Sequence, residues 1–232
     1  SVRSAPMGRT SVSPDGREIA ALVDKLPCGR HLQCRFVLGL SGSPGAGKTM
    51  LATALAEAYG VPVVPMDGFH RPNAELVTMG RRDAKGAPDT FDAEAYAALL
   101  RRLQAGGDVR APAFDHRLPD PLPDAIEVPG DAGLVVTEGN YLLLDEPRWL
   151  AVRRECDAVW HLVTDEETRI ERLVRRHNDS GKDPAHAREW VARVDQPNAD
   201  LVEAAAAVPD AADEVLDLTR WSGTIVSSVR GG

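Results

Sequence analysis

Residues 42–49, GSPGAGKT, constrain the fold of this chain more than any other segment. They match the phosphate-binding pattern G-x-x-x-x-G-K-[ST] at every fixed position. The pattern of apolar residues predicts a short buried strand before this loop, at residues 35–40, and a helix after it, at residues 50–59. Glycines at 42, 45 and 47 would let the backbone wrap a phosphate chain closely. The sequence therefore predicts a strand, a phosphate loop and a helix in succession.

The loop also predicts which residues bind a nucleotide. Backbone N–H groups and the positive end of the following helix would face the phosphates. Lys48 would reach the β- and γ-phosphates, and the Thr49 hydroxyl would bind Mg²⁺. The nucleotide-binding residues expected from the pattern are Gly42, Ser43, Pro44, Gly45, Ala46, Gly47, Lys48, Thr49 and Met50.

Composition excludes several classes of protein. The 232 residues are 43% hydrophobic and 27% charged, as in an ordinary globular domain. A net charge of −8 and only 5% aromatic residues argue against a nucleic-acid partner. No run of apolar residues is long enough to span a membrane, and residues 1–12 do not read as a secretory signal. We expect a cytoplasmic protein with free cysteines and a flexible segment 1–12, and leave open whether it forms a homodimer.

Predicted strands alternate with predicted helices along the rest of the chain. The strands are expected at residues 35–40, 61–65, 134–137, 158–163 and 213–218. This alternation is typical of a parallel sheet covered on both faces. We predict a single α/β domain over residues 13–232, a three-layer P-loop NTPase fold with a five-stranded parallel core sheet. Five prolines in residues 105–130 favour a hairpin-like insertion, and residues 165–184 are expected to form a lid.

Two carboxylates follow predicted strands at the edge of the sheet where ligands bind. Asp67 follows the second strand, and Glu138 follows the third. A polar loop comes after Asp67, so we assign it as the base that takes a proton from an attacking hydroxyl. Glu138 ends an apolar strand, and we assign it to the metal. A turn-capping role for Asp67 and a solvated strand end for Glu138 are the alternatives.

Five segments, in this order, resemble the phosphoribulokinase/uridine kinase/pantothenate kinase family of P-loop kinases. They are PMDGFH, KGAPDTFD, APAFDHRLPDP, VVTEGNYLL and DEETRIERLVRRHNDSGKD, and the resemblance runs from about residue 35 to residue 202. It implies ATP and Mg²⁺ as cofactors and transfer of the γ-phosphoryl group to a hydroxyl of a small metabolite. It also implies Asp67 as the catalytic aspartate and Glu138 as the matching strand-end glutamate.

The predicted helix 165–177 is rich in arginine and matches the lid of this family. Arg172 and Arg176 lie one turn apart, on one face. Guanidinium groups at that spacing would clamp phosphates, so both are assigned as catalytic residues. A solvated charged face is the alternative.

The acceptor is less constrained than the donor. Nucleoside kinases of the family tend to carry an aspartate–histidine pair just before the proline that is Pro88 here, but this chain has Gly86 and Ala87. Other segments look more like the pantothenate kinase branch and its sugar-kinase-like relatives. The resemblance makes His70, His116 and Asn198 candidate substrate contacts beside Asp67. Arg71 and Arg117 would help if the substrate is anionic.

Three classes of function were weighed. An N-K-x-D guanine motif and an LSGGQ-like signature are both absent, which argues against a GTPase switch and a transporter ATPase. The acidic balance argues against a kinase of nucleic acids. The favoured interpretation is an ATP-dependent kinase of a nucleoside or nucleoside-like metabolite. Sugar and pantothenate-like acceptors remain alternatives, and a non-kinase P-loop NTPase is the alternative from another class.

Overall fold

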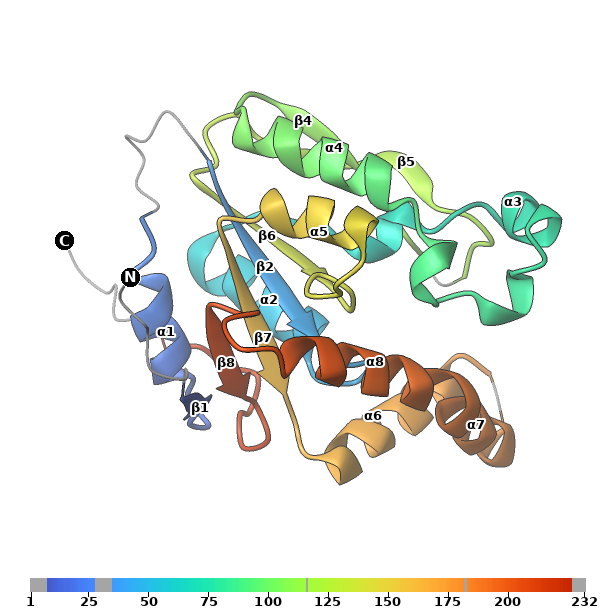
Figure 1. The fold of residues 1–232 in the computed structure, drawn as a ribbon. Helices are drawn as coiled ribbons and strands as arrows, with labels where there is room; N and C mark the ends of the chain where they lie inside the picture. Colours follow the sequence, from blue (N-terminus) through green and yellow to red (C-terminus); the bar gives the residue numbers. More distant parts are fainter. Residues whose placement is uncertain (1–7, 28–34, 116, 182, 227–232) are drawn as a thin grey trace.

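A sheet of six parallel strands forms the centre of the molecule, in the order β1-β8-β7-β2-β6-β3 (Figure 1). The computed structural model describes residues 8–27, 35–115, 117–181 and 183–226. The strands are β1 (Arg9–Ser11), β2 (Phe36–Gly42), β3 (Val63–Pro65), β6 (Leu134–Gly139), β7 (Ala158–Val163) and β8 (Glu214–Asp217). The α/β class and the parallel sheet are as predicted from the alternation of elements.

The sheet has one strand more than predicted. Residues 9–11, expected to be flexible, form β1 at the edge of the sheet beside β8, with Arg9 opposite Val215. The Arg9 guanidinium makes an ion pair with Asp217 at 2.8 Å, and the following Val12 is buried. A strand of three residues, without an alternating apolar pattern, has no signal of its own because its stability comes from the neighbouring strand.

Helices cover both faces of the sheet and complete three layers. They are α1 (Arg17–Val23), α2 (Lys48–Tyr59), α3 (Asn73–Thr78), α4 (Ala93–Gln104), α5 (Pro147–Arg154), α6 (Glu166–Asp179), α7 (Pro184–Trp190) and α8 (Gln196–Ala206). One apolar core joins α1 and α2 to the sheet, and the other joins α4, α5 and α8 to the opposite face. Val37 and Leu38 of β2 belong to different cores because successive strand residues point to opposite faces.

Side-chain caps begin helices α4 and α6. Asp92 accepts a hydrogen bond from Ala95 N–H at the start of α4, and Asp165 accepts one from Thr168 N–H at the start of α6, both at 2.9 Å. An aspartate in this position satisfies an otherwise unpaired N–H of the first turn. The Asp165 cap explains why the predicted helix 165–177 and the observed α6 begin at nearly the same residue.

Residues 105–130 form the hairpin expected from the sequence. Its antiparallel strands are β4 (Val109–Ala113) and β5 (Leu122–Val128), and its buried side chains join the core beside α4. The hairpin approaches the segment after β3 so closely that a Cβ on Gly68 would lie 2.4 Å from the carbonyl oxygen of Pro112. Only glycine fits there, which explains the glycine that follows Asp67.

The chain between residues 184 and 206 is helical throughout. One wide turn, Val191–Asp195, has π-helical hydrogen bonding and joins α7 to α8. Such turns redirect side chains and occur often at functional sites. Beyond the carboxyl ends of the strands, α3 projects on one side and α6 with α7 on the other (Figure 1).

No described helix is long and apolar enough to cross a membrane. Cys156 is a buried free thiol, and burial raises its pKa to about 12. Cys28 and Cys34 lie outside the described residues.

Candidate active site

The phosphate loop lies between β2 and α2, as predicted. Gly45 and Gly47 have φ angles of 84° and 104°, a conformation that glycine adopts without strain. A Cβ on Gly45 would lie 2.8 Å from the carbonyl oxygen of Arg169, so helix α6 presses directly on the loop. The fold thus places the start of the predicted lid against the phosphate site.

Lys48 is buried at the start of α2. Its ammonium donates hydrogen bonds to the carbonyl oxygens of Gly42 at 2.8 Å and Ser43 at 3.1 Å. Burial lowers the pKa of Lys48 to about 8, and the negative charges of Glu138 and Asp67 oppose that shift. A phosphate group in the loop would stabilise the ammonium and restore its ordinary charge.

Thr49 and Glu138 face each other across the loop. The Thr49 hydroxyl donates a hydrogen bond of 3.0 Å to the carboxylate of Glu138, and Glu138 is the next-to-last residue of β6. Burial raises the pKa of Glu138, and Lys48 opposes that shift. A hydroxyl and one carboxylate, with phosphate oxygens beside them, are the oxygen donors that Mg²⁺ prefers in nucleotide sites. The residues present therefore fit the predicted metal site.

Asp67 lies immediately beyond β3, in a single 3-10 turn, Met66–Phe69. Its carbonyl oxygen accepts a hydrogen bond of 2.9 Å from His70 Nδ1, so that ring nitrogen carries the hydrogen. The His70 ring lies against Phe91 and Phe114, with centroids 4.1 and 4.8 Å away. This stack fixes His70 at the wall of the cavity beside Asp67.

Arg172, Arg175 and Arg176 of α6 divide into two groups. Arg172 and Arg176 line the cavity, as predicted, and Arg175 points into solvent. The Arg172 Nη1 atom is buried and makes no hydrogen bond within the described part of the chain. It lies 3.5 Å from where a Cβ on Gly47 would be. An unpaired donor over the phosphate loop fits a phosphate oxygen.

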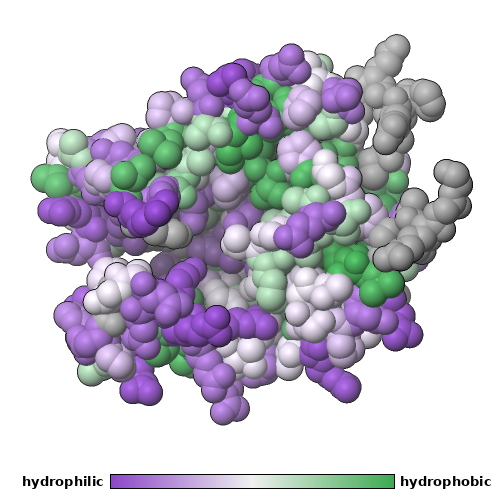
Figure 2. Space-filling model, turned by 180° about the vertical axis from the view of Figure 1, so that it is seen from behind, coloured by the Kyte–Doolittle hydropathy of each residue, from purple (hydrophilic) through white to green (hydrophobic). Residues whose placement is uncertain are grey.

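One cavity of about 830 Å³ brings these groups together. Among the predicted site residues, those that line it are Pro44, Gly45, Gly47, Lys48, Thr49, Met50, Asp67, His70, Glu138, Arg172, Arg176 and Asn198. Seen from behind, the surface is hollowed between two parts of the molecule, and the hollow is hydrophilic (Figure 2).

Residues 37–205 of this chain match the phosphoribulokinase/uridine kinase family. The chain belongs to this family. The match spans the phosphate loop, both carboxylates and the arginine helix.

Similar proteins agree with the family. The chain is 37% identical over 177 residues to the uncharacterized protein YggC of Escherichia coli K12, covering 73% of each chain. It is 35% identical over 196 residues to a Schizosaccharomyces pombe protein provisionally named uridine kinase, covering 78% of this chain and 83% of that one. A solved structure from Silicibacter sp. TM1040, described as a proposed fructose transport system kinase, has a TM-score of 0.73 and 34% identity, with 86% and 95% covered.

Three residues of the predicted nucleotide-binding loop are not among those that line the cavity. Gly42, Ser43 and Ala46 belong to the loop but do not line the cavity. The Ser43 hydroxyl instead donates to the Glu203 carboxylate at 2.6 Å, and Ala46 N–H donates to the Ser43 carbonyl at 3.0 Å. His116 lies outside the described residues. The Ser43 side chain therefore ties the loop to α8.

A buried His177–Asp195 pair was missed in the sequence. His177 Nε2 donates to Asp195 Oδ2 at 2.8 Å, and both side chains line the cavity. The pair joins α6 to the π-helical turn before α8, so it connects the arginine helix to the segment that carries Asn198. The pairing depends on tertiary structure, so the sequence carries no direct signal for it.

Proposed function

We propose that this protein is an ATP-dependent kinase that transfers the γ-phosphoryl group of ATP to a hydroxyl of a small metabolite. The observation that carries the proposal is one cavity in which Asp67 faces the same space as Lys48 and Glu138. A cation, a metal-binding carboxylate and a second carboxylate are the groups that this transfer requires. The family of the chain supports the same reaction class.

The donor half of the cavity would hold the phosphates of ATP. Lys48 would exchange its bonds to the loop carbonyls for phosphate oxygens, and the unpaired Arg172 Nη1 would donate to the phosphate chain. Thr49 and Glu138 would hold Mg²⁺, which supplies neutralising charge to the phosphates when it is bound. These groups stabilise charge on the transferring oxygens, which is where most of the rate enhancement arises.

Asp67 would act on the acceptor. Its carboxylate would take the proton from the acceptor hydroxyl as the oxygen forms a bond to the γ-phosphorus. The bond between that phosphorus and the bridging oxygen breaks, and ADP leaves with the electron pair. Arg176, which is exposed and lies one turn beyond Arg172 on α6, would stabilise the negative charge on the phosphoryl group during transfer.

The acceptor class that we propose is a polyhydroxy metabolite. This class includes nucleoside-like compounds, sugars and pantothenate-like alcohols. Of the relatives described above, one is named for uridine and one for fructose. Asn198 and His70 provide polar contacts in the acceptor half. A non-kinase NTPase is less well supported, because Asp67 would then have no hydroxyl to act on.

A screen of ADP release tests the proposal. The protein is incubated with ATP and Mg²⁺, with and without uridine, fructose, pantothenate and related alcohols. We expect ADP release that depends on one class of hydroxyl compound and is lost in Asp67→Asn. Arg175→Ala, on the solvent side of α6, is the matched control and should be unaffected. ADP release that no hydroxyl compound stimulates would contradict the proposal.

A further inference from the structure

The acceptor half of the cavity carries two cations that the donor phosphates do not use, Lys85 and Arg82. Both lie in the segment between α3 and α4, across the cavity from α6 and α7 (Figure 1). Within the described residues, neither makes an ion pair with a carboxylate at bonding distance. The charge of Asp120 raises the pKa of Lys85, and Asp120 itself accepts a hydrogen bond from Asn73 N–H at 2.7 Å.

Lys85 is held by uncharged oxygens. Its ammonium donates to Asn73 Oδ1 and to the Pro119 carbonyl oxygen, both at 2.9 Å, and lies 5.0 Å from the Phe114 ring centroid. An ammonium has three N–H donors, so these two bonds leave one donor for the cavity. Burial is the main cause that lowers the pKa of Lys85, and the charge of Arg82 acts in the same direction. An anion at this point would relieve both effects.

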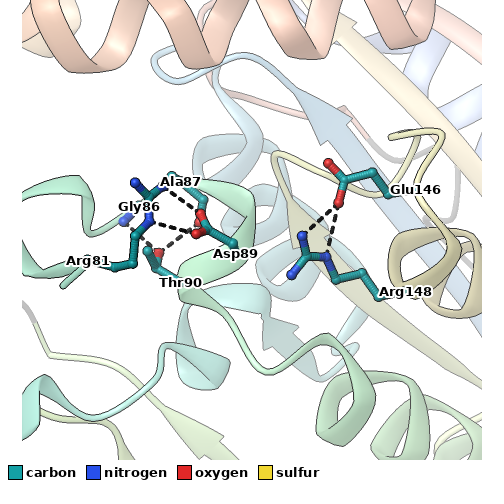
Figure 3. Close-up of polar contacts among 7 residues, drawn as sticks. All are labelled: Arg81, Gly86, Ala87, Asp89, Thr90, Glu146 and Arg148. Carbon is teal, nitrogen blue, oxygen red and sulfur yellow. Dashed lines mark hydrogen bonds and ion pairs between the residues drawn. The ribbon is translucent and has the colours of Figure 1, made fainter. Parts of the chain in front are cut away.

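The loop that carries Lys85 is fixed from several sides (Figure 3). Arg81 donates twice to the Asp89 carboxylate, at 2.6 and 2.8 Å. The Thr90 hydroxyl accepts from Gly86 N–H at 3.0 Å and donates to the Ala87 carbonyl at 2.7 Å. Tyr141 donates from its hydroxyl to the Gly86 carbonyl oxygen at 2.5 Å. Lys85 therefore occupies a preorganised position, as a binding residue requires.

Other groups near the acceptor are already engaged. Arg71 pairs with Glu75, and Arg117 pairs with Asp115 at 2.6 Å, so each of these arginines already has a carboxylate partner. Phe114 has His70 stacked on its ring and Lys85 beside it. A flat base would find that ring covered, whereas an anionic group would find an available cation.

We infer that the acceptor carries an anionic group, a phosphate or a carboxylate, which Lys85 and Arg82 bind while its reactive hydroxyl faces Asp67. The inference rests on the proposed function and narrows its acceptor to acidic metabolites. A carboxylate or phosphate oxygen would accept the third N–H of Lys85, and the exposed Arg82 would provide a second, weaker contact.

Matched pairs of probes test this inference by binding. Each pair shares its hydroxyl groups and differs mainly in charge: pantothenate with pantothenol, fructose 6-phosphate with fructose, and uridine 3′-monophosphate with uridine. Calorimetry is performed on protein saturated with Mg²⁺ and a non-hydrolysable ATP analogue. In at least one pair we expect the anion to bind roughly tenfold tighter or more, as one charge-assisted hydrogen bond implies. The pair that responds distinguishes a carboxylate from a phosphate.

Three variants tie the preference to Lys85. Lys85→Met should abolish the difference within the pair, whereas Lys85→Arg should retain most of it. Arg110→Met, which removes an exposed cation paired with Glu127 and away from the lining of this cavity, is the charge-matched control and should leave the difference unchanged. Thermal unfolding confirms that each variant is folded. Equal binding of both members in every pair, no binding of any anion, or a preference that survives Lys85→Met would overturn the inference.

ADP release separates this inference from the proposed function. Turnover of uncharged acceptors alone would overturn the inference and leave the kinase standing. Binding of an anion through Lys85, without ADP release for any hydroxyl compound, would retain the anion site and remove the kinase.

Discussion

The donor and acceptor halves of the cavity are built in different ways. The donor half is largely one stretch of chain, residues 42–50, closed by Glu138 and by Arg172 from α6. The acceptor half is assembled from the 3-10 turn after β3, the loop before α4, the hairpin and the segment around Asp195. A contiguous motif specifies its own geometry, whereas an assembled surface changes whenever one of its segments changes. The reaction class is therefore readable from local sequence, and the acceptor is not.

Electrostatics separate the two halves further. In the donor half, Lys48 and Glu138 are both buried. Burial lowers the pKa of Lys48 and raises the pKa of Glu138, so it favours the neutral form of each side chain. In the acceptor half, Lys85 is only half-buried and lies among uncharged oxygens. The donor half thus holds opposite charges that a Mg²⁺–nucleotide complex would complement, and the acceptor half holds one ammonium, that of Lys85, bonded only to uncharged oxygens within the described residues.

The largest expected effect is on the donor half. Lys48→Ala should reduce phosphoryl transfer to background, because the ammonium is the point charge that stabilises the transferring phosphate. The variant also loses the bonds to the Gly42 and Ser43 carbonyls, so circular dichroism must show an unchanged fold. Near-normal turnover in a folded Lys48→Ala protein would remove the loop from the reaction.

The next effect tests the boundary between the halves. Asp67→Asn should lower kcat by roughly 10²- to 10⁴-fold, the usual contribution of a general base, and leave ATP affinity nearly unchanged. Asparagine keeps the shape of the side chain and loses the proton acceptor. Acceptor-dependent kinetics and ATP titrations measure the two quantities. A collapse of ATP binding with altered Mg²⁺ dependence would show that Asp67 and Glu138 have exchanged roles.

A smaller effect is expected from the arginine helix. Arg172→Ala should lower kcat by roughly tenfold or more and change KM for ATP less, because its contact matters most during transfer. Steady-state kinetics measure both values. Arg175→Ala, with its side chain 85% exposed on the same helix, provides the comparison and should behave like the wild type. Equal kinetics for both variants would show that Arg172, like Arg175, takes no part in phosphoryl transfer.

The smallest expected effect is the uptake of part of a proton when ATP binds. Because the pKa of Lys48 is lowered to about 8 and phosphates favour the ammonium, ATP binding near that pH should take up a fraction of a proton. Affinity for ATP should fall as the pH rises further, because the free protein then holds neutral Lys48. Calorimetry in buffers of different ionisation enthalpy measures the uptake. Lys48→Arg, which stays charged, should show no proton uptake. The absence of uptake in the wild type would contradict the lowered pKa of Lys48.

Local signals explain which parts of the fold were predictable. The capping aspartates at 92 and 165 mark helix starts, and runs such as AVWHLV mark buried strands. The edge strand β1 and the π-helical turn Val191–Asp195 were missed because both depend on neighbours. The backbone of β1 pairs with a strand some two hundred residues later in the chain, and no residue type marks that pairing.

The same division applies to the site. Asp67 and Glu138 follow predicted strands, and Lys48 belongs to the loop that follows another. The geometry of parallel sheets brings the three together. Lys85 was not among the predicted contacts, because its position depends on bonds to Asn73 and Pro119 from separate segments. The acceptor half is therefore where the structure adds most to the sequence.

The fate of the γ-phosphoryl group tests the central claim most directly. Wild-type protein is incubated with γ-labelled ATP, Mg²⁺ and an acceptor selected by the binding experiments, and the products are separated. The two-halves account predicts label in an organic phosphate ester of that acceptor, with little free phosphate, and loss of both label transfer and ADP release in Asp67→Asn. Label found only in free phosphate, at a rate that acceptors and Asp67→Asn leave unchanged, would contradict it.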